Sequence, residues 1–211
     1  MEKIIVFGAS GGTGRMVIEQ ALQAGHQVTA VVRNPAAFSL RHPNLDIVEG
    51  DVLQLPTLSG KLEGHDVVIS CLGIPKIQQT TLYSQGMRNI VACMRQSGVN
   101  RIICISSGAL EVPAKSSWIM TFLLKNVLQR IYKPVYADMT LMEGILSESG
   151  LDWTVVRAPK LTDGKQTQKY KVITNEPLRS IPQISRADLA HYMLSHLKDR
   201  NTFRSRVDIA Y

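Results

Sequence analysis

Evenly spaced glycines near the amino terminus carry the clearest chemical signal in this sequence. The G-x-x-G-x-x-G segment contains Gly8, Ser10, Gly11, Gly12, Thr13 and Gly14. In such a pattern the first glycine permits a tight turn, the second lets the backbone approach a pyrophosphate, and the third lets a helix pack close to a sheet. Amides at the start of that helix, together with its dipole, favour a negative charge. The segment therefore predicts a dinucleotide-binding loop.

A basic residue lies where this type of loop selects its dinucleotide. Arg33 follows the apolar segment Gln27–Val32, at the position where an NAD-preferring fold carries a carboxylate for the ribose 2′-hydroxyl. A guanidinium there suits a 2′-phosphate instead, because it offers a planar fork of donors. Arg15 adds positive charge nearby in the sequence. We predict NADP(H) rather than NAD(H) as the cofactor; the alternative is that Arg33 is only a solvated arginine at the end of a strand.

Alternating strands and helices must position these residues. Apolar runs predict parallel strands at residues 3–7, 27–32, 45–48, 66–71, 101–105 and 152–157. Helical periodicity is expected over residues 14–24, 80–97, 135–149 and 185–197, a peripheral strand at 170–174 and a closing edge strand at 207–210. This alternation is typical of an α/β fold with a doubly wound, Rossmann-like parallel sheet. We expect a single domain over residues 1–211, with a small cap on the substrate side.

Ligands of such sheets bind at the carboxyl ends of the strands. We therefore expect the adenine beside the end of the third strand and the nicotinamide beside the ends of the fourth and sixth. The additional cofactor-contacting residues predicted in this way are Asp51, Val52, Cys71, Leu72, Gly73, Pro159 and Leu161.

The usual acid–base pair of short-chain dehydrogenases is missing from the sequence. That pair is a Tyr-x-x-x-Lys motif, whose lysine lowers the pKa of the tyrosine. None of the six tyrosines is followed four residues later by a lysine. Alcohol oxidation by that mechanism, and epimerisation through a transient ketone, are therefore not expected.

Composition limits the other classes of function. The formal net charge is +7, but no basic run is long enough to indicate a nucleic-acid surface, so we expect only a general attraction for anionic ligands. Cys71, Cys93 and Cys104 are far apart, which argues against a metal site and against a disulfide framework. Reduced cysteines, and a first strand that leaves no room for a signal peptide, favour a cytoplasmic protein.

An apolar insertion is expected at residues 113–134. Within it, residues 115–133 carry a broad apolar helical face with charged and polar residues opposite, but the segment is too short and too charged to span a bilayer. It could form a flap over the substrate, a dimer surface or a helix lying on a membrane. We favour the flap, because the segment follows the strand that carries Ser106. The sequence does not determine the oligomeric state.

Several motifs resemble those of a known family. They are FGASGGTG at 7–14, VR at 32–33, GDVL at 50–53, LG at 72–73, GMRNIV at 86–91, CIS at 104–106 and ESGL at 148–151. The sequence is similar to atypical short-chain dehydrogenase/reductases with an NmrA-like or NAD(P)H-binding domain, and within them to the biliverdin-IXβ and flavin reductases. The resemblance implies that NADPH binds in an extended pose and delivers hydride to a flat conjugated acceptor: a flavin, a bilin or a quinone. It also implies that Ser106 lies beside the nicotinamide and substrate.

Departures from this family fall on the substrate side. The family reductase has glutamine at the position of Gly12 and histidines at those of Glu143 and Lys160, so the resemblance does not identify the acceptor. Ser106 is our candidate for a hydrogen bond to the acceptor or to the carboxamide, and Lys160 or solvent is the candidate proton source. Two interpretations stay open: an NADPH-dependent reductase, or a non-enzymatic NADP(H) sensor that acts through a protein partner.

Overall fold

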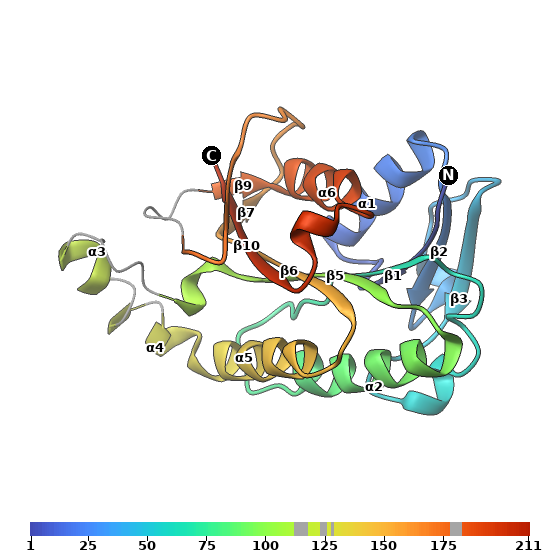
Figure 1. The fold of residues 1–211 in the computed structure, drawn as a ribbon, viewed down its shortest axis with the longest axis horizontal. Helices are drawn as coiled ribbons and strands as arrows, with labels where there is room; N and C mark the ends of the chain where they lie inside the picture. Colours follow the sequence, from blue (N-terminus) through green and yellow to red (C-terminus); the bar gives the residue numbers. More distant parts are fainter. Residues whose placement is uncertain (112–117, 123–125, 128, 178–182) are drawn as a thin grey trace.

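An eight-stranded sheet forms the centre of the molecule (Figure 1). The computed structural model describes residues 1–111, 118–122, 126–127, 129–177 and 183–211. The strand order is β3-β2-β1-β4-β5-β6-β10-β8, and β8 alone runs antiparallel to its neighbour. The strands are β1 (Lys3–Phe7), β2 (Gln27–Val32), β3 (Leu45–Glu49), β4 (Val67–Ser70), β5 (Arg101–Ser107), β6 (Asp152–Ala158), β8 (Lys171–Thr174) and β10 (Ser205–Ala210). The predicted doubly wound α/β fold is confirmed.

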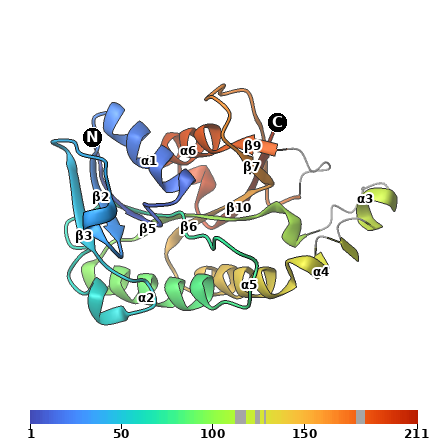
Figure 2. The same cartoon turned by 180° about the vertical axis from the view of Figure 1, so that it is seen from behind.

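Helices cover both faces of the sheet (Figures 1 and 2). One face is covered by α1 (Gly12–Gln23) and α6 (Arg186–Ser195), and the other by α2 (Leu82–Ser97) and α5 (Lys133–Ser147). Short 3₁₀ turns are η1 (Pro35–Ala37), η2 (Leu55–Leu58), η3 (Gly108–Leu110) and η5 (Arg200–Thr202). Each face therefore has its own apolar core.

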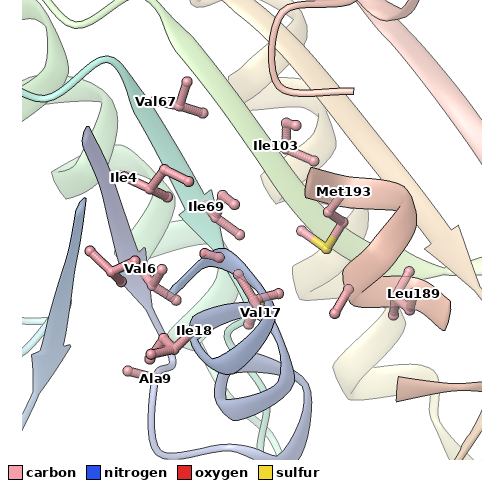
Figure 3. Packing of buried hydrophobic residues seen from close by; sticks show 14 of the residues in the cluster. Ile4, Val6, Ala9, Val17, Ile18, Val67, Ile69, Ile103, Leu189 and Met193 are labelled. Carbon is pink, nitrogen blue, oxygen red and sulfur yellow. The ribbon is translucent and has the colours of Figure 1, made fainter. Parts of the chain in front are cut away.

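Figure 3 shows the core beneath α1 and α6. Alternate residues of β1 and β4, such as Ile4, Val6 and Ile69, are fully buried on this face against Val17 and other helical side chains. The intervening residues of the same strands belong to the core under α2 and α5. Because the strands are buried on both faces, their sequences are continuous apolar runs.

Close backbone packing brings the glycine loop to the carboxyl edge of the sheet. Gly8 has a φ of +73°, and a Cβ atom built on it would lie 2.3 Å from the Cys71 carbonyl oxygen. A Cβ atom on Gly14 would lie 2.3 Å from the Gly8 carbonyl oxygen. Both positions therefore need glycine for packing of the loop itself. The strand order reverses beside β1, so this loop lies at the switch point where such sheets bind ligands.

The structure corrects two details near the carboxyl terminus and the insertion. We expected residues 207–210 to close the sheet, but β10 lies between β6 and β8, because β8 returns antiparallel along its outer side. We expected the helix after the insertion to begin at residue 135, whereas α5 begins at Lys133 and has Pro134 in its first turn, where the missing N–H leaves no intrahelical bond unmade. A separate parallel pair, β7 (Lys160–Thr162) and β9 (Gln183–Ser185), was not predicted.

The described part of the insertion lies beyond the N-terminal end of α5 (Figures 1 and 2). It contains α3 (Trp118–Phe122) and α4 (Gln129–Ile131), whereas residues 112–117, 123–125 and 128 lie outside the described residues. Trp118 is 79% exposed and Phe122 is 56% exposed. The flap, dimer and membrane interpretations of this segment stay predictions.

Candidate active site

The start of α1 presents backbone amides that no side chain caps. Gly11 is the N-cap residue and has an extended backbone, and the first turn contains no acidic residue. Ser10, Gly11 and Gly12 are exposed, whereas Thr13 and Gly14 are buried. The first amides of a helix need an external acceptor, and an anion satisfies them well. The loop therefore fits the pyrophosphate of a dinucleotide.

Two arginines lie near the connection that follows β2. Arg33 is exposed directly after the strand, as the sequence predicts. Arg15, in the first half of α1, donates through Nη2 to Ser39 Oγ at 2.9 Å, which ties it to the same connection as Arg33. The side chain of Asn34 accepts from the Ala36 amide and begins η1. This arrangement places two guanidinium groups near the carboxyl end of β2, and that of Arg15 also pairs with Glu19 at 3.4 Å.

The other predicted cofactor positions cluster at the ends of β3 and β4. Asp51 Oδ1 accepts from the Leu53 amide at 3.0 Å, so this carboxylate already stabilises the turn after β3. The carbonyl of Val52 accepts from Asn89 Nδ2 at 2.7 Å. Leu72 is half-buried and Gly73 exposed, and a Cβ atom on Gly73 would meet no atom of the other described residues within 4 Å, its chain neighbours apart. Packing does not require glycine at position 73, which leaves room there for a ligand.

Buried cysteines are poor candidates for redox chemistry here. Cys71, beside the glycine loop, is buried, and burial raises the pKa of its thiol to about 12. Burial also raises the pKa of the Cys104 thiol, and the nearby Glu143 charge acts in the same direction. Only the thiolate is a good nucleophile, so both side chains behave as core residues at neutral pH.

A cavity of about 950 Å³ opens at the carboxyl edge of the sheet. Its walls come from the segment after β4, the end of β5, the first half of α5, the β6–β7 turn and the start of α6. The lining residues are Ile74, Pro75, Lys76, Ile77, Tyr83, Ser107, Ala109, Tyr132, Val135, Tyr136, Met139, Pro159, Lys160, Leu161, Gln183 and Arg186. Of the predicted site residues, Pro159, Lys160 and Leu161 therefore line the cavity, and Lys160 is exposed at it.

The structure corrects the choice of serine. Ser106 is only 2% exposed and donates to Glu143 Oε1 at 2.7 Å, so its hydroxyl does not line the cavity. Strand side chains alternate, and Ser106 follows Cys104 toward the face that α5 covers. The next residue, Ser107, lines the cavity instead. The sequence shows two adjacent serines at the strand end, but only the strand's orientation decides which one faces the cavity.

Tyrosines that sequence analysis missed form one wall. Tyr132 and Tyr136 stack with ring centroids 5.4 Å apart and an interplanar angle of 17°. Burial raises the pKa of Tyr136, while a hydrogen bond with the Ser107 side chain partly opposes this effect. At neutral pH its phenol therefore carries a proton. Our sequence test asked only for a lysine four residues after a tyrosine, so it could not detect a tyrosine paired with Ser107.

A buried charge cluster fixes the helix that carries Tyr136. Glu143 is 3% exposed and accepts from Ser106, from Arg157 Nε and Nη2 at 3.0 and 2.7 Å, and from Arg206 Nε at 2.9 Å. Burial alone would raise the pKa of Glu143, but its bonds to Arg157 and the other donors lower it below the usual value. Arg157 also pairs with Glu111 at 2.9 Å. The cluster joins α5 to β5, β6 and β10 behind the cavity.

A second carboxylate joins α5 to α2. Asp138 is 4% exposed and accepts from the backbone amides of Tyr83 and Ser84 at 2.9 and 3.3 Å. Burial raises the pKa of Tyr83, and its hydrogen bond with the Ile74 backbone partly opposes the effect. These bonds hold the segment after β4 against the cavity. No cluster of histidine, cysteine and acidic side chains suited to a metal ion is found within the described residues.

Sequence comparison places the chain in a family. Residues 8–200 match the NAD(P)H-binding family, and the chain belongs to it. The chain is 26% identical over 206 residues to the Bacillus subtilis protein YwnB, which covers 93% of this chain and 92% of the relative. It is also 26% identical over 147 residues to the photosystem II assembly factor Ycf39 of Synechocystis, a match to 67% of this chain but only 44% of Ycf39.

Solved structures share the fold along the whole chain. A Burkholderia pseudomallei protein proposed to be exported has a TM-score of 0.83 at 26% identity, over 100% of both chains. A Veillonella parvula short-chain dehydrogenase/reductase in complex with NADP has a TM-score of 0.82 at 17% identity, over 100% of this chain and 94% of its own. A Streptococcus pneumoniae protein with a proposed NADH-flavin reductase activity has a TM-score of 0.79 at 22% identity, over 100% of this chain and 99% of its own. Among the residues that the structure describes, no helix is long and apolar enough to cross a membrane.

Proposed function

We propose that the protein is an NADP(H)-dependent reductase of a flat conjugated acceptor such as a flavin, a bilin or a quinone. The observation that carries this proposal is the cavity walled by stacked tyrosines at the carboxyl edge of the sheet, next to the glycine loop. Its volume of about 950 Å³ is at the upper end for small-molecule sites, enough for a ring system and the end of a dinucleotide. The fold it shares with a protein of proposed flavin reductase activity supports the same class.

NADP(H) is the proposed form of the dinucleotide. Support comes from the exposed Arg33 after β2 and from Arg15, which is bonded to the connection that follows Arg33. Two guanidinium groups favour a phosphate on the ribose over a free hydroxyl. Cofactor selectivity therefore rests mainly on charge at the end of β2.

The reduced nicotinamide supplies a hydride, and the chain's own residues have to bind, orient and protonate the acceptor. The stacked faces of Tyr132 and Tyr136 suit a flat ring, and Pro159 and Leu161 form apolar walls. Tyr136, paired with Ser107, would donate a hydrogen bond and then a proton to the acceptor atom that gains negative charge. Lys160 is a second donor at the cavity, and solvent would reprotonate either group. Holding the nicotinamide ring and the flat acceptor at reacting distance then provides much of the acceleration of hydride transfer.

A direct absorbance assay of nicotinamide oxidation tests the proposal. The protein is mixed with NADPH or NADH and with a flavin, a bilin or a quinone, and loss of the nicotinamide band is followed against protein-free controls. We expect oxidation well above the control with at least one acceptor, and faster oxidation of NADPH than of NADH.

A second candidate, a non-enzymatic NADP(H) sensor, is favoured by the missing Tyr-x-x-x-Lys motif and by the assembly-factor relative. Tight binding of both redox forms without oxidation of any acceptor would support the sensor and refute the reductase.

A further inference from the structure

Arg186 reaches the glycine loop from the other end of the chain. It is the first residue of α6, whose N-cap Ser185 accepts from the Asp188 amide at 3.0 Å. Helix α6 lies beside α1 on the same face of the sheet (Figures 1 and 2). A Cβ atom built on Gly12 would lie 2.8 Å from both Cδ and Nε of Arg186. The arginine side chain therefore rests directly on Gly12.

The same side chain lines the cavity. Arg186 thus borders both the predicted pyrophosphate loop and the proposed nicotinamide and acceptor space. An extended dinucleotide that begins at the loop and ends in the cavity has to pass this guanidinium. Arg186 is 28% exposed and pairs through Nη1 with Asp163 at 2.6 Å, but Asp163 is 91% exposed, and ion pairs of this kind are weak. A guanidinium has five N–H donors, so a phosphate can bind while the Asp163 contact persists.

The position of the Arg186 side chain depends on the absence of a side chain at Gly12. Any side chain at position 12 would displace the arginine, because even a single carbon atom comes within 2.8 Å of it. The resemblance described above places a glutamine at this position in the family reductase. In this chain the side chain of Arg186, from α6, occupies the space next to residue 12 instead.

We propose that Arg186 binds the pyrophosphate of the dinucleotide and that Gly12 makes room for it. This inference rests on the proposed cofactor, and it assigns the two basic regions different tasks. Arg33 recognises the 2′-phosphate, which only NADP(H) carries. Arg186 recognises the phosphates that NADH and NADPH share.

Calorimetric titration of NADPH and NADH into wild type and Arg186→Ala tests the assignment. We expect Arg186→Ala to weaken both cofactors by the same factor, about 10- to 100-fold for one lost hydrogen-bonded charge. The NADPH-to-NADH ratio should stay unchanged, and adenosine 2′-phosphate, which has no pyrophosphate, should keep its affinity. Arg200→Ala removes the same charge from an exposed site in η5, just before β10 begins, and should change neither cofactor.

The outcomes separate this inference from the proposed function. If wild type binds NADPH and Arg186→Ala binds it equally well, the role of Arg186 is refuted while the reductase proposal stands. If wild type binds neither cofactor, the proposed function itself fails. Thermal unfolding checks that Arg186→Ala folds, and Arg186→Gln provides the same test if it does not.

A double-mutant cycle tests the dependence between the two positions. Gly12→Ala should weaken NADPH binding in the wild-type background, because the new methyl group displaces Arg186. In the Arg186→Ala background the same change should cost clearly less affinity, since no side chain remains to be displaced. Additive losses would contradict the proposed coupling.

Discussion

Replacing Glu143 by glutamine should destabilise the protein strongly. The carboxylate accepts four hydrogen bonds from Ser106, Arg157 and Arg206 while only 3% exposed. A glutamine keeps one acceptor oxygen but, in either orientation of its amide, turns an N–H donor toward an N–H group of Arg157. Breaking a buried ion pair typically costs about 3–5 kcal/mol. We expect about 3 kcal/mol, because Arg157 keeps its pair with Glu111, whose side chain is 53% exposed.

The loss should depend on pH in a defined direction. Because the folded-state pKa of Glu143 lies below its usual value of 4.5, its ionised form stabilises the fold above that pH. This contribution is lost as the pH falls through the lower folded-state pKa, where protonated Glu143 resembles glutamine. The stability difference between wild type and Glu143→Gln should therefore be full near pH 7 and shrink in acid.

Urea unfolding between pH 7 and about pH 3 measures both effects. Glu148→Gln is the matched control, because Glu148 is exposed at the end of the same helix, and it should stay within about 0.5 kcal/mol of wild type. A loss below about 1 kcal/mol at pH 7, or a difference that grows in acid, would refute the idea that the buried carboxylate is ionised and holds α5 in place.

Further predictions concern cofactor selectivity, proton donation, glycine packing and the accessibility of a cysteine. Arg33→Asp should lower the NADPH-to-NADH affinity ratio about 10-fold or more, and an unchanged ratio in calorimetry would contradict its role. Tyr136→Phe should reduce turnover about 100-fold while NADPH affinity stays constant, and unaltered steady-state rates would remove it as the proton donor. Gly14→Ala should destabilise the fold by about 1–3 kcal/mol, because its methyl group would lie 2.3 Å from a backbone oxygen. Gly144→Ala, whose new methyl group meets no described residue beyond its own helix within 4 Å, should instead stabilise α5 slightly in the same unfolding assay. Cys71, with its pKa raised to about 12, should resist alkylation at pH 7 until the protein unfolds, and rapid native-state labelling would show that it is accessible.

Local patterns were sufficient to predict the fold and to place the residues that we propose for one end of the cofactor site. Runs of apolar residues predicted the bounds of the parallel strands within one or two residues, because strands covered on both faces must be apolar throughout. The glycine spacing predicted the turn from β1 into α1, since Gly8 and Gly14 meet backbone atoms a few residues away or on the adjacent strand. The position of Arg33 directly after β2 was predicted from the pattern of the strand alone. Each of these conclusions depends on short stretches of sequence and on general rules for parallel sheets.

Only the tertiary structure decided which residues form the cavity. Ser106 meets Glu143 in the second half of α5, whereas Ser107, one residue further along β5, meets Tyr136 in the first turn of the same helix and lines the cavity. The contact between Arg186 and Gly12 joins residues far apart in the chain and leaves no periodic signal in either segment. Such contacts depend on how α5 and α6 pack across the finished sheet, and that packing results from the whole core rather than from any local pattern.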